Sequence, residues 1–120
     1  MSYGFYKVLH ILGLLMLFSG LAGTIVHAAN RGEKASNVMR GALAALHGGG
    51  LLLLLVSGFG NVAELGIGFP GWVFVKVAIW LVFGALIVLP YRKPQWNQAL
   101  LWLLPVLGAF AAYLAIYKPF

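Results

Sequence analysis

The sequence predicts an all-α integral membrane protein, built as an up-down-up-down bundle of four transmembrane helices. Of its 120 residues, 62% are hydrophobic and only 8% are charged, whereas roughly a quarter of the residues in a soluble domain carry charge. Four apolar segments are each close to the ~20 residues that a helix needs to cross the hydrocarbon of a bilayer. The connections between them are short, so consecutive helices become antiparallel neighbours. We therefore expect one transmembrane domain over residues 1–120.

The four helices are expected over residues 5–29, 36–60, 71–89 and 96–117. The first connection is the polar stretch Asn-Arg-Gly-Glu-Lys at residues 30–34. The second contains Gly66, Gly68 and Pro70, and the third begins with Pro90 and ends with Pro94. Glycine and proline interrupt helices, so these positions separate the apolar segments.

Charge and composition exclude several classes of protein. The formal net charge of +6 comes from eight Lys and Arg residues against two acidic residues. In a membrane protein this excess reflects topology and lipid headgroups, and we expect no nucleic-acid partner. The chain has no cysteine, which excludes disulfides, thiolate metal sites and cysteine nucleophiles. No phosphate-binding loop, zinc-binding pattern or Ser-His-acid set occurs, so the sequence indicates no catalytic residue and no metal site.

The distribution of Lys and Arg predicts the orientation in the membrane. The first and third connections carry Arg31, Lys34, Arg92 and Lys93. Because cytoplasmic loops are enriched in Lys and Arg, these two connections are expected in the cytoplasm. We expect the chain in a bacterial inner membrane, with both termini outside the cytoplasm.

Small residues indicate where helices pack closely. Lipid offers no hydrophobic drive for helix association, so membrane helices associate through faces of small side chains. Such residues recur at helical spacing in the first, second and fourth segments. The predicted packing residues are Gly13, Gly20, Gly41, Ala45, Gly49 and Gly108.

A histidine followed by glycine three residues later occurs twice in apolar runs, at His10 and at His47. An ionisable residue within a bilayer is costly, which makes each a candidate functional residue. Lys76 is the third candidate, since His10 and Lys76 both lie roughly 7–8 Å from the same end of their helices. Arg40 lies seven residues before His47 on the same helical face. His27, beside the first connection, is expected to be a solvated residue at a helix end.

Three interpretations of these residues remain open. In the first, Lys76 and Arg40 extend to lipid headgroups, and each histidine hydrogen-bonds a neighbouring helix. In the second, His10 with His47, or His10 with Lys76, ligates a b-type haem, because imidazole suits haem iron and helix bundles hold such cofactors. In the third, His10, His47 and Arg40 form a path for protons or a quinone.

Two short stretches resemble the HemJ-type protoporphyrinogen oxidases. Lys-Val-Leu-His-Ile-Leu-Gly at residues 7–13, continuing to Phe-Ser-Gly-Leu at 18–21, resembles the first helix of that family. Gly-Trp-Val-Phe-Val-Lys at residues 71–76 resembles its later G-W-x-x-x-K element. The chain is also similar to the small helical membrane families of the CopD and SirB kinds. The resemblance implies that His10 and Lys76 form a functional pair near a b-type haem. Residues 22–27 lack the Pro-Arg-Leu element of that family, so the resemblance does not extend to the oxidase reaction.

The sequence thus favours a small, non-catalytic membrane subunit that packs against a larger membrane assembly. Its partners would be the lipid bilayer and other membrane protein subunits. The alternative is a b-type haem-binding protein of redox or porphyrin metabolism, similar to HemJ. An optical spectrum of the purified protein would distinguish the two.

The orientation can be tested with introduced cysteines, since the chain has none of its own. In the Lys34→Cys variant, the thiol should resist a membrane-impermeant reagent added to intact cells, because the first connection is expected in the cytoplasm. In the Ser2→Cys variant, the thiol should react. The reverse labelling pattern would overturn the predicted orientation.

Overall fold

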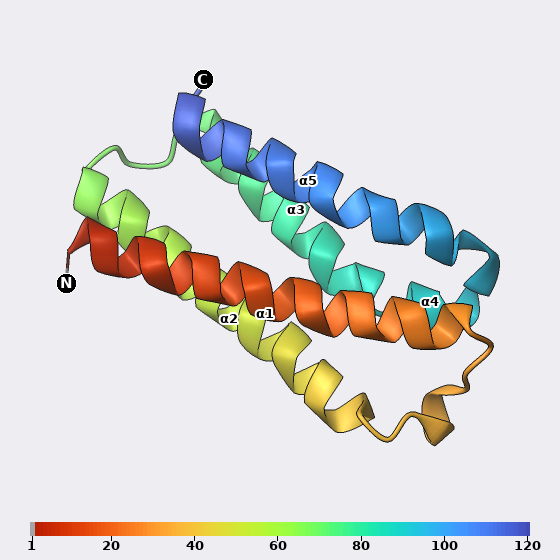
Figure 1. Ribbon diagram of the computed structural model, residues 1–120. Helices are drawn as coiled ribbons and strands as arrows, with labels where there is room; N and C mark the ends of the chain where they lie inside the picture. Colours follow the sequence, from red (N-terminus) through yellow and green to blue (C-terminus); the bar gives the residue numbers. More distant parts are fainter. Residues whose placement is uncertain (1) are drawn as a thin grey trace.

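The chain is helical over nearly all of its length. The computed structural model describes residues 2–120, and within them no strand occurs, which confirms the all-helical prediction. The four main helices are α1 (Tyr3–Ala29), α2 (Arg40–Leu65), α3 (Gly71–Leu86) and α5 (Asn97–Tyr117). A short helix, α4 (Leu89–Arg92), and two 3₁₀ turns, η1 (Lys34–Ser36) and η2 (Pro94–Trp96), complete the connections. Figure 1 shows α2 returning alongside α1, and α5 returning alongside α3.

The second helix lies several residues further along the chain than the expected 36–60. Residues 34–36 form the turn η1, and the Asn37 side chain accepts a hydrogen bond from the Met39 amide at 3.0 Å. Such a local side-chain bond competes with a helix, so α2 begins at Arg40. At its other end α2 continues to Leu65 and stops at Gly66, whose left-handed φ of 65° forms a glycine C-cap.

The third helix is shorter than the expected 71–89 and ends at Leu86. Pro90 explains this end, because its ring lacks an N–H and clashes with the carbonyl of the residue four positions earlier, which is Leu86. The first helix begins at Tyr3, two residues earlier than expected, because the Ser2 side chain caps it by accepting from the Phe5 amide at 3.2 Å.

Within residues 2–120, three helices are long and apolar enough to cross a membrane. They are α1, α2 and the segment Pro94–Tyr117, whose most apolar windows have mean hydropathies of 2.0, 1.9 and 2.2. The fourth apolar helix, α3, has 16 residues. The molecule measures 47 Å in its longest dimension, which compares with the ~40–45 Å thickness of a bilayer including its headgroups.

The most extensive helix–helix interface joins α1 to α2, and it is a contact between backbones. A Cβ added at Gly50 would lie 2.6 Å from both the Gly13 carbonyl oxygen and the Leu17 amide nitrogen. A Cβ added at Gly20 would lie 2.6 Å from the Leu43 carbonyl oxygen. Only glycine fits where two helix backbones approach this closely.

This interface uses a different face of α2 from the one expected. Nothing lies within 4 Å of a Cβ built at Gly41, and Ala45 is exposed. A Cβ at Gly49 would meet only the terminal methyl of Met16, at 3.1 Å. The close backbone contact with α1 is made by residues 43, 47 and 50, and of the three predicted packing residues of α2 only Gly49 approaches α1, at Met16. The expected positions on α1, Gly13 and Gly20, do lie in the interface.

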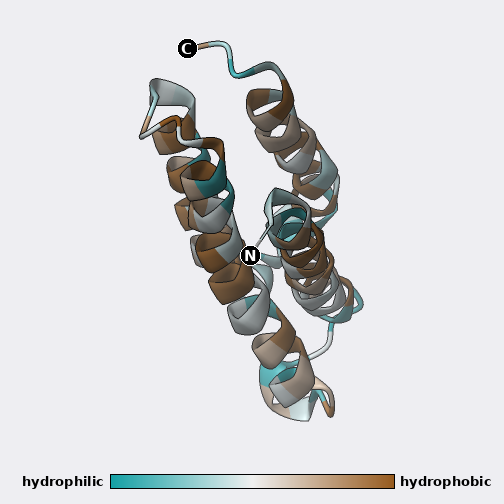
Figure 2. Cartoon of the chain, turned by 90° about the vertical axis from the view of Figure 1, so that its left-hand side faces the viewer, coloured by the Kyte–Doolittle hydropathy of each residue, from teal (hydrophilic) through white to brown (hydrophobic). Residues whose placement is uncertain are grey.

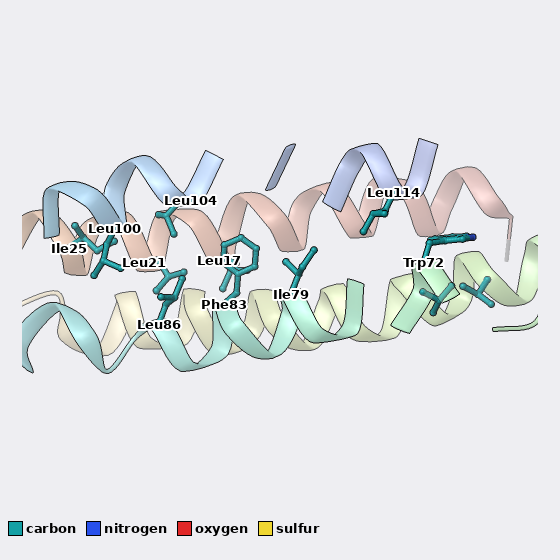
Figure 3. Close-up of a cluster of buried hydrophobic side chains, with 12 residues drawn as sticks. Leu17, Leu21, Ile25, Trp72, Ile79, Phe83, Leu86, Leu100, Leu104 and Leu114 are labelled. Carbon is teal, nitrogen blue, oxygen red and sulfur yellow. The ribbon is translucent and has the colours of Figure 1, made fainter. Parts of the chain in front are cut away.

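Large side chains hold α1, α3 and α5 together. Figure 3 shows residues from these helices meeting in one cluster, and the Phe18 and Phe83 rings add an aromatic contact with centroids 5.5 Å apart. Gly108 of α5 packs on the Phe18 ring, which would lie 2.8 Å from an added Cβ. The main buried members of the cluster are Leu17, Leu21 and Ile25 of α1, Trp72, Val73, Ile79, Phe83 and Leu86 of α3, and Leu100, Leu104 and Leu114 of α5.

The outer faces of the helices are apolar as well. Figure 2 shows hydrophobic residues along most of the length of the helices. Val8, Leu15, Leu52, Phe74 and Val106 are each more than 60% exposed. So many large apolar side chains facing outward on all four main helices are unusual for a soluble monomer and suit a surface that faces lipid.

The glycine interface predicts opposite effects for two neighbouring alanine substitutions. Gly50→Ala should destabilise the protein by about 1–3 kcal/mol, because its Cβ meets backbone atoms that cannot move independently. Gly48→Ala is the matched control, since its Cβ meets nothing within 4 Å and alanine favours a helix by about 0.8–1 kcal/mol over glycine. Thermal unfolding in mild detergent, followed by circular dichroism, measures both. Equal stability of the two variants would show that α1 and α2 do not approach closely at Gly50.

Candidate functional site

An apolar cavity of about 370 Å³ lies between α1, α2, α3 and α5. It occupies the half of the molecule where α1 and α3 begin and where α2 and α5 end. Small-molecule sites commonly have volumes of about 300–1,000 Å³, so the cavity is large enough for a ligand. α5 contributes mostly small side chains at i, i+3, i+4 and i+7 spacing, so one face of that helix carries no bulky side chain. These residues are Gly108, Ala111, Ala112 and Ala115.

His10 is held in this cavity by Ser57 of α2. The His10 Nδ1 atom lies 2.9 Å from the Ser57 hydroxyl oxygen, and Ser57 itself is fully buried. The Ser57 hydroxyl donates its proton to the Leu53 carbonyl at 2.5 Å, which is the usual backbone bond of a serine inside a helix. Since a hydroxyl has one proton, His10 must be the donor in its bond with Ser57.

This hydrogen bond determines which His10 nitrogen is free. With its proton on Nδ1, a neutral imidazole presents Nε2 as an unprotonated acceptor. Among the described residues, no hydrogen bond to His10 Nε2 is formed, and the buried side-chain atoms without a partner are Asn61 Oδ1 and Asn97 Oδ1. His10 therefore offers an accessible lone pair, with its ring orientation fixed by a neighbouring helix, as metal-binding histidines typically do.

Lys76 lines the same cavity, together with two other polar groups that sequence patterns did not single out. Asn61, one helical turn after Ser57 on α2, has a buried Oδ1 without a hydrogen-bond partner. The Trp80 indole donates to the Leu51 carbonyl at 2.9 Å, which joins α3 to α2 beside the cavity. The structure thus brings His10 and Lys76 to one cavity.

His47 has a different role. Its Nε2 atom donates to the Phe83 carbonyl oxygen at 3.0 Å, and the residue is 7% exposed. Phe83 is one of the last four residues of α3, whose carbonyls lack partners within the helix. His47 therefore satisfies the end of α3 and ties it to α2. It lies ten residues before Ser57, about 15 Å along α2, so the structure does not bring His47 to His10.

Two further basic residues lie away from the cavity. Arg40 is the exposed first residue of α2, at the opposite end of the molecule. His27 was expected to be solvated, but it is half-buried and bonded within the protein. Its Nδ1 lies 2.7 Å from the Tyr91 hydroxyl, which also accepts from Asn37 Nδ2 at 3.2 Å. The bond from His27 ties the last turn of α1 to α4, and the bond from Asn37 joins the first connection to α4. His10, His47 and Arg40 do not line one path among the described residues, because the cavity reaches only His10.

Sequence reasoning missed Ser57 and Asn61 as site residues. The sequence does contain a pattern that could have identified them, because two polar residues at i and i+4 spacing interrupt the apolar second half of α2. It also missed Lys7 and Lys118, which line the cavity rim from α1 and from the residue after α5. Both stand near helix ends, where sequence alone cannot distinguish a ligand-facing lysine from one that extends to headgroups.

No family model matches the chain, and neither a curated protein nor a solved structure matches it.

Proposed function

We propose that this chain is an integral membrane protein whose four main helices cross the bilayer in an up-down-up-down arrangement. The support is the length and apolarity of three helices, the apolar outer surface and the 47 Å length of the molecule. α3 alone, at 16 residues, is short for a span of ~30 Å. Together with α4 it extends from residue 71 to residue 92, which is sufficient.

Within this membrane domain, the cavity binds a planar apolar cofactor of the b-type haem class, with His10 as an axial ligand. The observation that carries this proposal is the Nδ1 bond from His10 to buried Ser57, which leaves Nε2 free at an apolar cavity. Haem iron is commonly held by such a histidine, and the lining of aliphatic and aromatic side chains suits a tetrapyrrole ring. When bound, haem would supply an iron that exchanges one electron.

The residues around the cavity have separate parts in this function. Ser57 fixes the ring of His10 and its tautomer, the small face of α5 provides the space, and Trp80 secures α3 against α2. His47 stabilises the bundle and is not a ligand in this proposal, since its Nε2 proton is bonded to Phe83. The resemblance of residues 7–13 and 71–76 to HemJ-type proteins supports the same assignment for His10 and implies a functional Lys76 near it.

A second candidate is the non-catalytic subunit of a larger membrane assembly. The observation that favours it is the outward face of α2, where Gly41, Ala45 and Gly48 leave open surface at close to one-turn spacing. In a bilayer, such a face suits a helix of another membrane subunit. The two candidates are compatible, because the outward face of α2 and the cavity are different surfaces.

The haem proposal predicts the absorption spectrum of protein purified in mild detergent from haem-replete cells. The wild type should show a Soret band and sharp bands on reduction, and His10→Ala should lose them. Ser57→Ala should keep haem with affinity reduced about 10–100-fold, as for other partners of metal-binding histidines. His27→Ala is the control, because His27 is bonded to Tyr91 outside the cavity, and its spectrum should equal the wild type.

Two results would contradict this proposal. Wild-type protein without a Soret band would remove the cofactor and leave the subunit candidate. An unchanged spectrum in folded His10→Ala protein would show that another residue holds the iron.

A further inference from the structure

In the part of the chain that the structure describes, the rim of the cavity carries three lysines and no acidic residue. Lys7 comes from the second turn of α1, Lys76 from the second turn of α3, and Lys118 from the residue that follows α5. None of the residues that line the cavity is an aspartate or a glutamate. We call Lys7, Lys76 and Lys118 the lysine rim. Three separate elements therefore bring positive charge to one apolar space.

Two members of the lysine rim have partners within the protein. The Lys7 ammonium lies 5.4 Å from the centroid of the Tyr3 ring. The Lys118 ammonium lies 5.7 Å from the centroid of the Trp72 ring and donates to the Ala115 carbonyl at 2.6 Å. These aromatic and carbonyl contacts stabilise a cation but bring no negative charge to the cavity mouth.

Lys76 differs from Lys7 and Lys118, because among the described residues it has neither an ion-pair partner nor an aromatic one. It is half-buried, it lines the cavity, and it lies five residues after the start of α3. A cation away from bulk water is costly unless it is paired. The lysine rim thus lacks the negative charge that would compensate it, and the neighbouring cavity is where that charge can enter.

The depth of the lysines relative to His10 indicates how a ligand would lie. Lys7 is three residues before His10 on α1, which places it about 4.5 Å nearer the end of the helix. A ligand with its apolar body against His10 would therefore hold its charged groups at the lysine rim. Further from these helix ends the cavity is lined by Trp80 and Phe83 of α3 and by Gly108 of α5, where an anion would be unfavourable.

We propose that the lysine rim binds the carboxylates of the ligand that occupies the cavity, so that this ligand is a dicarboxylic amphiphile oriented with its acid groups toward the ends of α1, α3 and α5. This inference rests on the proposed function, which it deepens. A b-type haem has two propionate groups and meets this description. Lys76 is then an anion-binding residue in the charged state and is not the second ligand of the iron.

The test compares metal-free protoporphyrin with its dimethyl ester, which has the same ring without the negative charges. Binding is followed by quenching of the protein's tryptophan fluorescence, since Trp72 and Trp80 line the cavity, in phosphatidylcholine nanodiscs. Wild-type protein should bind the free acid at least about tenfold more tightly than the ester, as for hydrogen bonds between charged partners. The triple variant Lys7→Met, Lys76→Met, Lys118→Met should lose this preference.

Three further variants separate the lysine rim from the proposed axial ligand. Lys76→Arg should retain the preference for the acid, because it keeps the charge. Lys34→Met is the matched control, since Lys34 lies in η1 and does not line the cavity. His10→Ala should also retain the preference, because a metal-free ring needs no axial ligand. A haem spectrum lost in His10→Ala with the acid preference intact supports both proposals.

The outcomes that overturn the inference differ from those that overturn the haem proposal. Equal affinity of the wild type for acid and ester, with a normal haem spectrum, would leave the haem proposal standing and reject the lysine rim. A preference that persists in the folded triple variant would reject it as well. If phosphatidylglycerol in the nanodisc abolishes the preference, a lipid phosphate holds the rim, and the assignment to ligand carboxylates is wrong.

Discussion

The structure depends on the backbone contact between α1 and α2, which glycine alone permits. At Gly50 and at Gly20 any side chain would meet main-chain atoms of the other helix. This contact fixes the register of two antiparallel helices, because neither can slide without moving a larger residue into the gap. Two turns beyond Gly50, the register brings Ser57 to His10. The tautomer of His10, and with it the chemistry of the cavity, therefore follows from a packing contact.

The bundle combines two kinds of packing, and the cavity lies where they meet. Backbone contacts join α2 to α1, while leucine and aromatic side chains join α1, α3 and α5 in the core (Figure 3). Toward the ends of α2 and α5, the small face of α5 replaces those large side chains, and space remains. Hydrogen bonds from His47 and Trp80 to carbonyls hold α2 and α3 together beside it. The space is thus bounded by fixed elements, as a preformed ligand site requires.

The length of the apolar segments predicts the helical class and the approximate helix positions. Helix rise predicts that His10 and Lys76 lie at a similar depth. The contacting face of α2 could not be predicted, since residues 41–50 contain four glycines or alanines besides Gly41, Ala45 and Gly49 and offer several small faces. The role of His47 depends on where α3 ends, which Pro90 determines from a distant part of the sequence. Ser57 and the lysine rim become meaningful only when four helices meet, and periodicity within one helix cannot reveal that.

The central claim is that His10 presents an unprotonated Nε2 to the cavity because its Nδ1 proton is bonded to Ser57. Nitrogen NMR of protein labelled only at its three histidines, with His10 assigned from the His10→Ala spectrum, tests this directly. In the ligand-free protein at neutral pH, the account predicts a protonated Nδ1 and an unprotonated Nε2 for His10, and loss of this single tautomer in Ser57→Ala. A proton on Nε2 of His10 in the wild type would contradict it, because that nitrogen could not then accept a metal.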